Sequence, residues 1–466
     1  MKTTFLATLL IFQVSTVIAQ GGPPQFNSVI TALEFDAEGR LYVGGFFSEV
    51  AGMPAVGLVR WDGAAWEPLG DGTMDVGAMR FVGDTLYVGG ENLDPHANHE
   101  QVARWTPEGF EPFGTFRHRC CGSPTIYAIE ADPNGGLIVA GNFTEVDTFF
   151  EANSLARWRD AQWETIGARI EGTIIVDDAM DAVLGVLTDS QNVYIAGLFD
   201  RVGTLETGGL AKWTGSAWEG LATGPESVYV LVFGPEGSLY AGGGFTDIDG
   251  KEINRIARWD GTAWEPLGAG IDGEILFGSG VSALAADAEY VYAAGDFESA
   301  GGIPANNIAR WDGQSWEPLG GGLNSRVDVL RVGPDGSLYA AGFFTEAGGV
   351  PVSQLARWDG ERWHAVGIVA PVGTEEVDPA PGDRFSLFPN PADSRFTVGL
   401  DVSESGPVRV LLYDLLGRHV ATPLDAWLPA GSHRMPIDVS PLSAGIYLVW
   451  IEHAGQRKTS MLRVIH

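Results

Sequence analysis

The chain has 466 residues, 45% of them hydrophobic and 19% charged, so it is long enough to bury more than one core. Its 60 acidic and 28 basic residues give a net charge of −32 at pH 7. Nucleic acids and anionic membranes are bound through lysine and arginine, so this charge argues against both as partners. Residues 1–384 carry the whole excess of acidic residues over basic ones. This excess either keeps the protein soluble or attracts a divalent cation such as calcium or a cationic partner.

Residues 1–19 have the composition of a secretory signal peptide. Lys2 is followed by an apolar run from Phe5 to Ala19, just before Gln20. This run is shorter than the ~18 apolar residues that a transmembrane helix needs, and no later run approaches that length. We therefore expect export of the chain, removal of residues 1–19 and no transmembrane segment.

Two aromatic residues separated by four others occur seven times between residues 26 and 367. The pairs are Trp61/Trp66, Trp105/Phe110, Trp158/Trp163, Trp213/Trp218, Trp259/Trp264, Trp311/Trp316 and Trp358/Trp363. Each repeat holds four short apolar segments separated by Gly, Pro and Asp turns, which predicts a four-stranded meander. A period of about 45–50 residues is typical of a propeller blade. We predict an all-β chain with a seven-bladed β-propeller of four-stranded antiparallel blades over residues 20–367, and aromatic pairs between the blades.

The order of the motifs within each repeat carries a family resemblance. A run such as LYVGG, at Leu41 and again at Leu86, ends the second strand, and RWDG, at Arg60, leads into the fourth. This order resembles the kelch-type propeller and, more closely, secreted bacterial propeller repeats. The resemblance covers residues 26–367 and implies a fold but no activity, because propellers host many unrelated functions.

A basic residue precedes the first aromatic residue of every pair. These residues are Arg60, Arg104, Arg157, Lys212, Arg258, Arg310 and Arg357. Side chains alternate along a strand, so each should point away from the tryptophan and pair with an acid or stack on an aromatic ring of a neighbouring blade. Recurrence in every blade indicates a structural contact rather than a ligand-binding ring. We interpret the tryptophans in the same way, as packing residues rather than sugar-stacking platforms.

The second repeat departs most from the others, in two loops that should emerge at one end of the propeller. They contain His96, His99, His118, Cys120 and Cys121. Histidine and cysteine are the preferred ligands of zinc and copper, so these residues are a candidate ligand or transition-metal site. No short motif here has an established ligand spacing, and an ordinary variable loop is the alternative. The adjacent cysteines could also form a disulfide or stay as thiols.

Two long insertions between blades belong to the same end. They carry the candidate binding-face acids Asp177, Asp178, Asp181, Asp272 and Glu274. Variable loops on a rigid scaffold are where recognition usually occurs, so we expect a glycan, protein or surface ligand to bind here.

Residues Asp247, Asp249 and Gly250 imitate the start of an EF-hand calcium loop. Such a loop needs further oxygen ligands and a glutamate at its twelfth position. Alignment with the other repeats places Asp249 and Gly250 at a turn, which is the interpretation that we favour.

Residues 368–384 are rich in Pro and acids and predict a linker, and residues 385–466 predict a small β-sandwich as a second domain. The motifs FPNPA from Phe388, YDLLGR from Tyr413 and the terminal KTSMLRVIH resemble the type A C-terminal sorting domain of the type IX secretion system. The matching motif residues are Pro389, Asn390, Pro391, Gly445, Tyr447 and Lys458. The resemblance implies recognition by the secretion machinery, followed by cleavage and either release or attachment at the outer cell surface.

Taken together, these features predict an exported, monomeric, non-catalytic binding or adhesion module without a cofactor. The sequence has no nucleophile elbow, HExxH motif or P-loop. The alternative is a secreted enzyme, either a metal-dependent oxidase or a polysaccharide-active protein, with its site on the loop face. A copper oxidase would need several histidines near the axis, and the propeller offers only His96, His99, His118 and His364. A mainly structural surface protein is the third hypothesis.

Overall fold

The computed structural model describes residues 26–69, 75–91, 100–106, 108–117, 124–147, 150–171, 182–224, 227–273, 280–367, 384–388, 395–402, 405–414, 419–440, 442, 445–453 and 456–464. One 3-10 turn, η1 (Pro235–Gly237), interrupts an otherwise all-β set of elements in these residues. No helix in this set is long and apolar enough to cross a membrane. The chain divides into two compact units, Met1–Val369 and Ala370–His466. The predicted signal peptide 1–19 and residues 368–383 of the predicted linker lie outside the described residues, and residue 384, predicted as the end of the linker, begins a strand.

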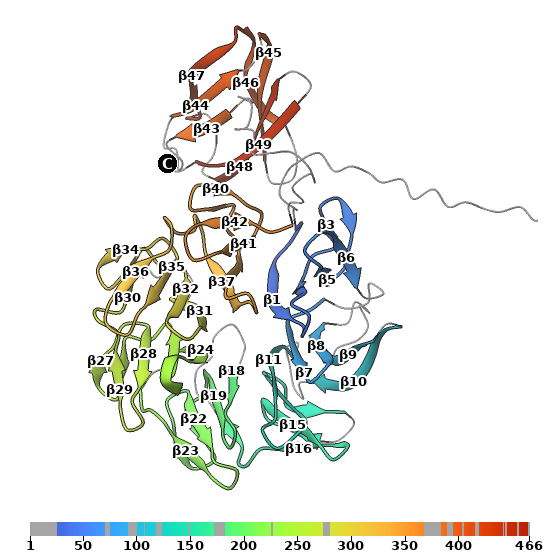
Figure 1. The fold of residues 1–466 in the computed structure, drawn as a ribbon, viewed down its shortest axis with the longest axis vertical. Coiled ribbons are helices and arrows are strands. Elements are labelled where there is room, and N and C mark those ends of the chain that lie inside the picture. Colours follow the sequence, from blue (N-terminus) through green and yellow to red (C-terminus); the bar gives the residue numbers. More distant parts are fainter. Residues whose placement is uncertain are drawn as a thin grey trace, which may run out of the picture. The chain divides into compact units, whose positions relative to one another are not determined.

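The described part of the first unit contains seven sheets in which four successive strands, a to d, form an antiparallel meander (Figure 1). The a strands are β1 (Ile30–Phe35), β7 (Ala78–Val82), β11 (Ile126–Ala131), β18 (Ala182–Thr188), β24 (Val228–Phe233), β31 (Val281–Ala286) and β37 (Val327–Val332). The b strands are β2 (Leu41–Gly45), β8 (Thr85–Glu91), β12 (Leu137–Gly141), β19 (Val193–Leu198), β25 (Leu239–Gly243), β32 (Val291–Gly295) and β38 (Leu338–Gly342). This order confirms the predicted all-β fold with four-stranded antiparallel blades.

The outer strands carry the aromatic pairs. The c strands are β5 (Leu58–Trp61), β9 (Glu100–Thr106), β15 (Leu155–Arg159), β22 (Leu210–Trp213), β28 (Ile256–Trp259), β35 (Ile308–Trp311) and β41 (Leu355–Trp358). The d strands are β6 (Trp66–Leu69), β10 (Gly109–Arg117), β16 (Gln162–Thr165), β23 (Trp218–Gly220), β29 (Trp264–Pro266), β36 (Trp316–Pro318) and β42 (Trp363–Ala365). In each blade the two aromatic residues face each other across the c–d hairpin, as Trp358 and Trp363 do.

The a strands form the inner wall of the ring. Each contacts the a strands of the blades before and after it, and β1 contacts both β7 and β37, which closes the circle. Figure 1 shows these strands around the middle of the first unit, with the later strands of each blade farther out. The starts of the a strands therefore define one end of the ring, close to its axis.

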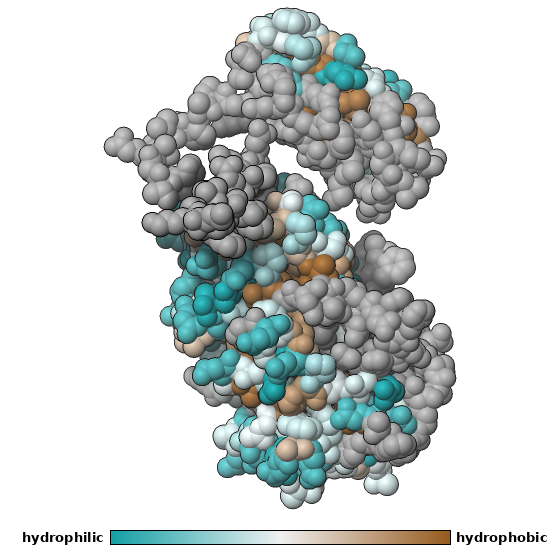
Figure 2. All heavy atoms as spheres, turned by 90° about the vertical axis from the view of Figure 1, so that its right-hand side faces the viewer, coloured by the Kyte–Doolittle hydropathy of each residue, from teal (hydrophilic) through white to brown (hydrophobic). Residues whose placement is uncertain are grey.

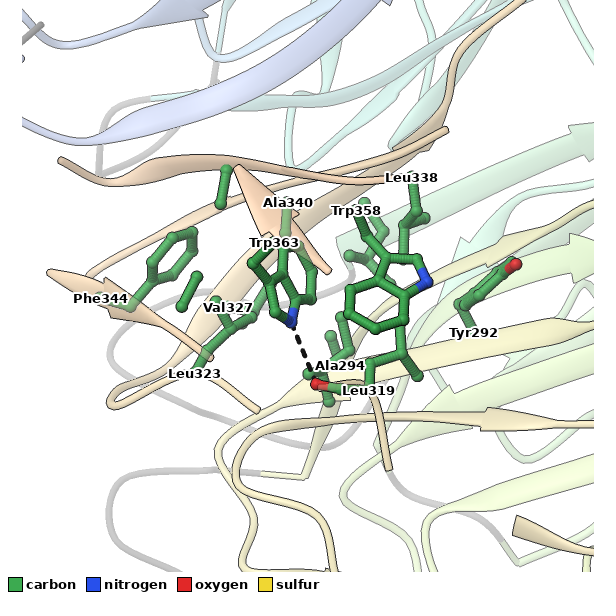
Figure 3. Close-up of a cluster of buried hydrophobic side chains, with 14 of the residues drawn as sticks. Tyr292, Ala294, Leu319, Leu323, Val327, Leu338, Ala340, Phe344, Trp358 and Trp363 are labelled. Carbon is green, nitrogen blue, oxygen red and sulfur yellow. Dashed lines mark hydrogen bonds between the residues drawn. The ribbon is translucent and has the colours of Figure 1, made fainter. Parts of the chain in front are cut away.

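Tryptophans of the d strands bind one blade to the next. The indole Nε1 groups of Trp218, Trp264, Trp316 and Trp363 donate hydrogen bonds to the carbonyls of Ile166, Leu221, Leu267 and Leu319 in the preceding blade, at 3.1, 2.8, 2.8 and 3.0 Å. Figure 3 shows Trp363 pointing at the Leu319 carbonyl within a cluster of apolar side chains from both blades. The prediction that the aromatic pairs lie between the blades is confirmed, and these four tryptophans are used in packing.

Geometry explains why the motif that begins with the second aromatic residue ends in glycine. Gly320 has a φ of +53°, and a Cβ added to it would lie 2.4 Å from a ring carbon of Trp358. Any side chain at this position would strain the backbone and push the next blade's tryptophan away. The motif therefore ends in glycine because the next blade packs directly on it.

The recurring basic residues make ion pairs within their own blade. Arg104, Lys212 and Arg310 pair with the glutamate opposite them on strand d, at 2.7, 2.5 and 2.8 Å. Arg157 instead pairs with Asp132, and Arg357 with Asp335. The predicted structural role is confirmed, but placing an aromatic partner in a neighbouring blade was wrong: Arg310 lies over Tyr290 of its own blade, 4.2 Å from the ring centre.

Small hairpins between strands b and c cover one end of the ring. They are β3 (Glu49–Val50) with β4 (Met53–Pro54), β13 (Glu145–Val146) with β14 (Phe150–Glu151), β20 (Arg201–Val202) with β21 (Leu205–Glu206), β26 (Asp247–Ile248) with β27 (Lys251–Glu252), β33 (Ser299–Ala300) with β34 (Ile303–Pro304), and β39 (Glu346–Ala347) with β40 (Val350–Pro351). Short strands in the linkers that lead into two of the blades pair with the hairpin of the blade they enter. These are β17 (Ile170–Glu171), which pairs with β20, and β30 (Ile271–Asp272), which pairs with β33.

The N-terminal segment also pairs with the hairpin of the blade it enters, at the point where the ring closes. Phe26 forms a β-bridge with Val50 of the first blade, as Leu323 does with Ala347 of the last. The Phe26 ring packs on Trp66, and its carbonyl accepts a hydrogen bond from Gln354 of the last blade at 3.5 Å. Among the described residues the last blade takes no strand from the N-terminal segment, so the first and last blades meet by packing.

A chain of alternating charges joins four a strands at one register position. Glu34 pairs with Arg331 of the last blade and with Arg80 of the second, and Arg80 pairs with Glu130 of the third, at 3.1 Å. Each of these residues lies opposite the second residue of the LYVGG-like motif in its b strand, for example Glu34 opposite Tyr42 and Arg80 opposite Tyr87. Removing one member would leave a poorly solvated charge without its partner, so these ion pairs stabilise the packing of the blades around the closure.

A half-buried tyrosine provides a pH-dependent contribution to stability. Burial and a 2.9 Å hydrogen bond to Asp189 raise the pKa of Tyr194 to about 12, from an ordinary value of 10.0. Because the folded-state pKa is the higher one, this contribution is present below pH 10.0 and is lost as the pH rises towards about 12. We expect Tyr194→Phe to flatten the loss of stability over that range in urea unfolding, and an unchanged pH dependence would contradict this.

The second unit is a sandwich of two antiparallel sheets. One sheet contains β43 (Arg384–Phe388), β44 (Arg395–Val402) and β47 (Gly431–Asp438), and the other contains β46 (His419–Leu428), β45 (Gly406–Asp414), β48 (Gly445–His453) and β49 (Gln456–Val464). Phe396 and Val398 of the first sheet share one buried cluster with Val410 and Val449 of the second. The predicted β-sandwich is confirmed, and it has a core of its own.

Candidate functional site

The hairpin end of the ring does not contain the calcium loop that the sequence imitates. Asp249 and Gly250 have φ angles of 55° and 72° and form the two-residue turn between β26 and β27. The Asp249 carboxylate accepts hydrogen bonds from the backbone N–H and the hydroxyl of Thr223, at 2.7 and 2.8 Å. It therefore ties the incoming chain to the hairpin, and the turn interpretation is confirmed.

Most of the predicted loop residues lie outside the described part of the chain. These are His96, His99, His118, Cys120, Cys121, Asp177, Asp178, Asp181 and Glu274. Asp272 is described: it is exposed, and its carboxylate lies 3.7 Å from Nη1 of Arg255. His364 lies on the outer strand β42, where its Nε2 is 2.5 Å from Asp359, so it is held in a surface turn.

Arg255 anchors the base of the insertion that carries Asp272. Its side chain is buried, and it donates hydrogen bonds to the carbonyls of Ile271 and Gly273, at 2.8 and 3.2 Å. Its backbone has a φ of 62°, an unusual value for a residue with a side chain. The corresponding residue of the next blade, Asn307, reaches the Leu323 carbonyl in the same way, at 2.8 Å. In these two blades this position therefore clamps the blade to the following linker.

Three exposed aromatic residues belong to this end of the ring. Phe46 and Phe343 directly follow the b strands of the first and last blades, and 47% and 49% of their surfaces are exposed. Their backbone N–H groups donate to the carbonyls of Val29 and Arg326, which lie just before the a strands. Tyr127, near the start of the a strand β11, is 37% exposed. Three rings thus lie beside the inner strands at the end where the linkers enter.

Polar groups lie beside these rings. Arg326 Nε donates to Asp328 at 2.6 Å, and Asp296 follows strand b of the sixth blade, at the position that Phe46 and Phe343 occupy in theirs. Burial, with a smaller contribution from the charge of Asp296, raises the pKa of the Asp328 carboxyl, and Arg326 opposes the shift. We call these six residues the axial rim: Phe46, Tyr127, Asp296, Arg326, Asp328 and Phe343.

The sequence analysis missed the axial rim, although one signal was visible. Most b strands are followed by a single phenylalanine that is buried, such as Phe143 and Phe245. The first and last repeats have two in succession, and the second of the two, Phe47 or Phe344, is the buried one. The extra phenylalanine is therefore not needed for the fold, which favours a role at the surface.

Both hydrophilic and hydrophobic side chains occur on the described surface. On the side of the molecule drawn in Figure 2, hydrophilic residues are spread over the described surface, with hydrophobic ones among them. In the described part of the first unit, the large hydrophobic side chains that are exposed are Phe46, Tyr127, Ile303 and Phe343. Three of these four belong to the axial rim. No group of three or more metal-ligating side chains occurs within the ranges given above.

Comparison with solved structures gives weak similarities. The structure of YjhT matches with 14% identity and a TM-score of 0.35, over 63% of this chain and 99% of that one. A glycoside hydrolase family 43 arabinoxylan arabinofuranohydrolase from Bacillus subtilis, in complex with cellotetraose, matches with 11% identity and a TM-score of 0.28, over 94% of this chain and 95% of that one. Latent PorU from Porphyromonas gingivalis matches with 12% identity and a TM-score of 0.18, over 82% of this chain and 31% of that one. These similarities are too weak to transfer a function.

No curated protein matches the chain. The second unit is different, because residues 386–465 match the family described as "Secretion system C-terminal sorting domain". Of the predicted motif residues, Pro389, Asn390 and Pro391 lie outside the described residues, Gly445 begins β48, Tyr447 is buried within it, and Lys458 lies on β49 opposite Ile451. The C-terminal sandwich is thus a sorting domain of the type IX secretion system, carried by a propeller-type all-β unit.

Proposed function

We propose that this protein is a non-catalytic binding or adhesion module that acts outside the cell and takes its ligand at the axial rim. The sorting domain supports export and a cell-surface or secreted location. In the proposed route, the signal peptide 1–19 directs the first export step, and the secretion machinery then reads the C-terminal domain. The mature chain acts as a monomer.

The observation that carries the proposal is the exposure of Phe46, Tyr127 and Phe343 at one end of the ring. Several d-strand tryptophans are buried between the blades, whereas Phe46 and Phe343 expose about half of their surface. Exposed aromatic residues beside hydrogen-bonding groups are typical of binding surfaces. Asp272, the described member of the predicted acids, belongs to the same end, and we propose it as an outer contact of the ligand.

Binding without turnover is the test of this function. The purified chain, exposed to intact cells and to immobilised polysaccharides and proteins, should be retained without releasing reducing ends or oxidised products. Retention should fall in a variant that replaces Phe46, Tyr127 and Phe343 by alanine. Product release that depends on the same residues would show an enzyme instead. Retention that the triple substitution leaves unchanged would place the ligand elsewhere.

A further inference from the structure

We infer that the axial rim binds an uncharged polysaccharide chain, with Phe46 and Phe343 as stacking platforms and Arg326 as the main hydrogen-bond donor. This inference rests on the proposed function and names its ligand class. The two phenylalanines occupy equivalent positions in blades that are neighbours across the ring closure, since β1 and β37 are in contact. The proposed site therefore spans the junction of the first and last blades.

The chemistry of the rings favours a sugar. A phenylalanine offers no polar atom, so a ligand that contacts its exposed half must present an apolar face. A pyranose ring presents C–H groups on its faces and hydroxyls at its edge, and therefore needs hydrogen-bonding groups beside the platform. Arg326 lies beside the Phe343 platform, because its carbonyl accepts a hydrogen bond from the backbone N–H of Phe343 at 2.9 Å. Its side chain therefore supplies the hydrogen-bonding group that the sugar needs.

The arginine is oriented for this role. Asp328 holds Arg326 Nε at 2.6 Å, and the Arg326 side chain is 45% exposed. A guanidinium group has five N–H donors in a rigid fork, so this contact fixes its plane and leaves other donors for hydroxyl groups of a ligand. Asp328 would then act as a positioning residue, because it acts through Arg326.

Charge decides between classes of sugar. The axial rim contains two carboxylates, Asp296 and Asp328, and one guanidinium, and the whole chain has a net charge of −32. Uronic acids and sulfated glycans would meet repulsion both locally and at long range. The apolar surface consists of separate rings among polar groups, unlike the continuous apolar centre of a protein interface. These features together favour a neutral glycan over an acidic one or a protein.

Calorimetric titration of the full chain with defined oligosaccharides tests the inference. The neutral probes are cello-, xylo- and manno-oligosaccharides; the charged probes are oligogalacturonates and chitosan oligomers. We expect binding of at least one neutral series, weakened about tenfold or more when both Phe46 and Phe343 are replaced by alanine. Trp427→Ala is the matched control, because this 70% exposed aromatic residue lies in the other unit and should leave the affinity unchanged.

Several outcomes would overturn the inference. One is that only charged oligosaccharides bind. Another is that the double variant keeps its affinity for neutral oligosaccharides. The third is that Trp427→Ala lowers this affinity as much as the double variant does. Thermal melting of each variant separates lost binding from lost folding. If no oligosaccharide binds but retention on cells still depends on Phe46 and Phe343, the sugar assignment fails and the proposed binding function stands.

Discussion

Replacing Trp363 by alanine is expected to lower the free energy of unfolding of the propeller by about 3–5 kcal/mol. The side chain is only 2% exposed, and its removal would leave a cavity between the last two blades. It would also leave the Leu319 carbonyl without the hydrogen bond that now measures 3.0 Å. Urea unfolding followed by circular dichroism provides the measurement. A loss below about 1 kcal/mol would contradict the conclusion that Trp363 holds the last two blades together.

Two further variants separate the causes of this loss. Trp363→Phe keeps most of the packing but removes the indole donor, so we expect an intermediate loss of about 1–3 kcal/mol. Phe110→Ala changes the equivalent position of the second blade, where the ring is only partly buried. We expect a loss of about 1 kcal/mol there. Equal losses for Trp363→Ala and Phe110→Ala would show that burial between blades is not the cause.

The blades were predictable because the residues that pack between them recur once in every repeat. The pairs from Trp61/Trp66 to Trp358/Trp363 mark the c–d hairpins, and Asp-Gly turns such as Asp260-Gly261 set their register. Asp260 shows why that turn residue recurs: its carboxylate accepts the backbone N–H groups of Thr262 and Ala263, at 2.7 and 2.8 Å. These contacts are local in sequence, so a single chain reveals them.

The ring closure and the axial rim depend on contacts between residues that are distant in sequence. Gln354 and Phe26, or Glu34 and Arg331, meet only when the ring is complete, and no periodicity predicts such pairs. Arg326 and Phe343 lie in parts of the repeat that vary from blade to blade. The predicted loop site does not include them because it was drawn from histidine, cysteine and acidic side chains in the most variable loops, whereas the exposed groups at this end are aromatic.

Removing residues 384–466 is expected to abolish delivery of the propeller to the cell surface and the medium, while the propeller itself still folds. The physical reason is the separation of the two cores. Phe396, Val410 and Val449 belong to a cluster within the second unit, and the tryptophan clusters belong to the first. Immunodetection in surface, medium and periplasmic fractions measures delivery, and thermal melting of the truncated chain checks its folding.

A point substitution distinguishes recognition of the folded sandwich from recognition of its sequence alone. Val449 is fully buried in the middle of β48, so Val449→Asp would place a charge in the core of the sandwich and unfold it. If the machinery reads the folded domain, this variant should fail to reach the surface as completely as the truncated chain does. Normal delivery of Val449→Asp would show that the machinery reads an extended motif, such as the segment around Lys458. Normal delivery of the truncated chain would show that export does not depend on this domain.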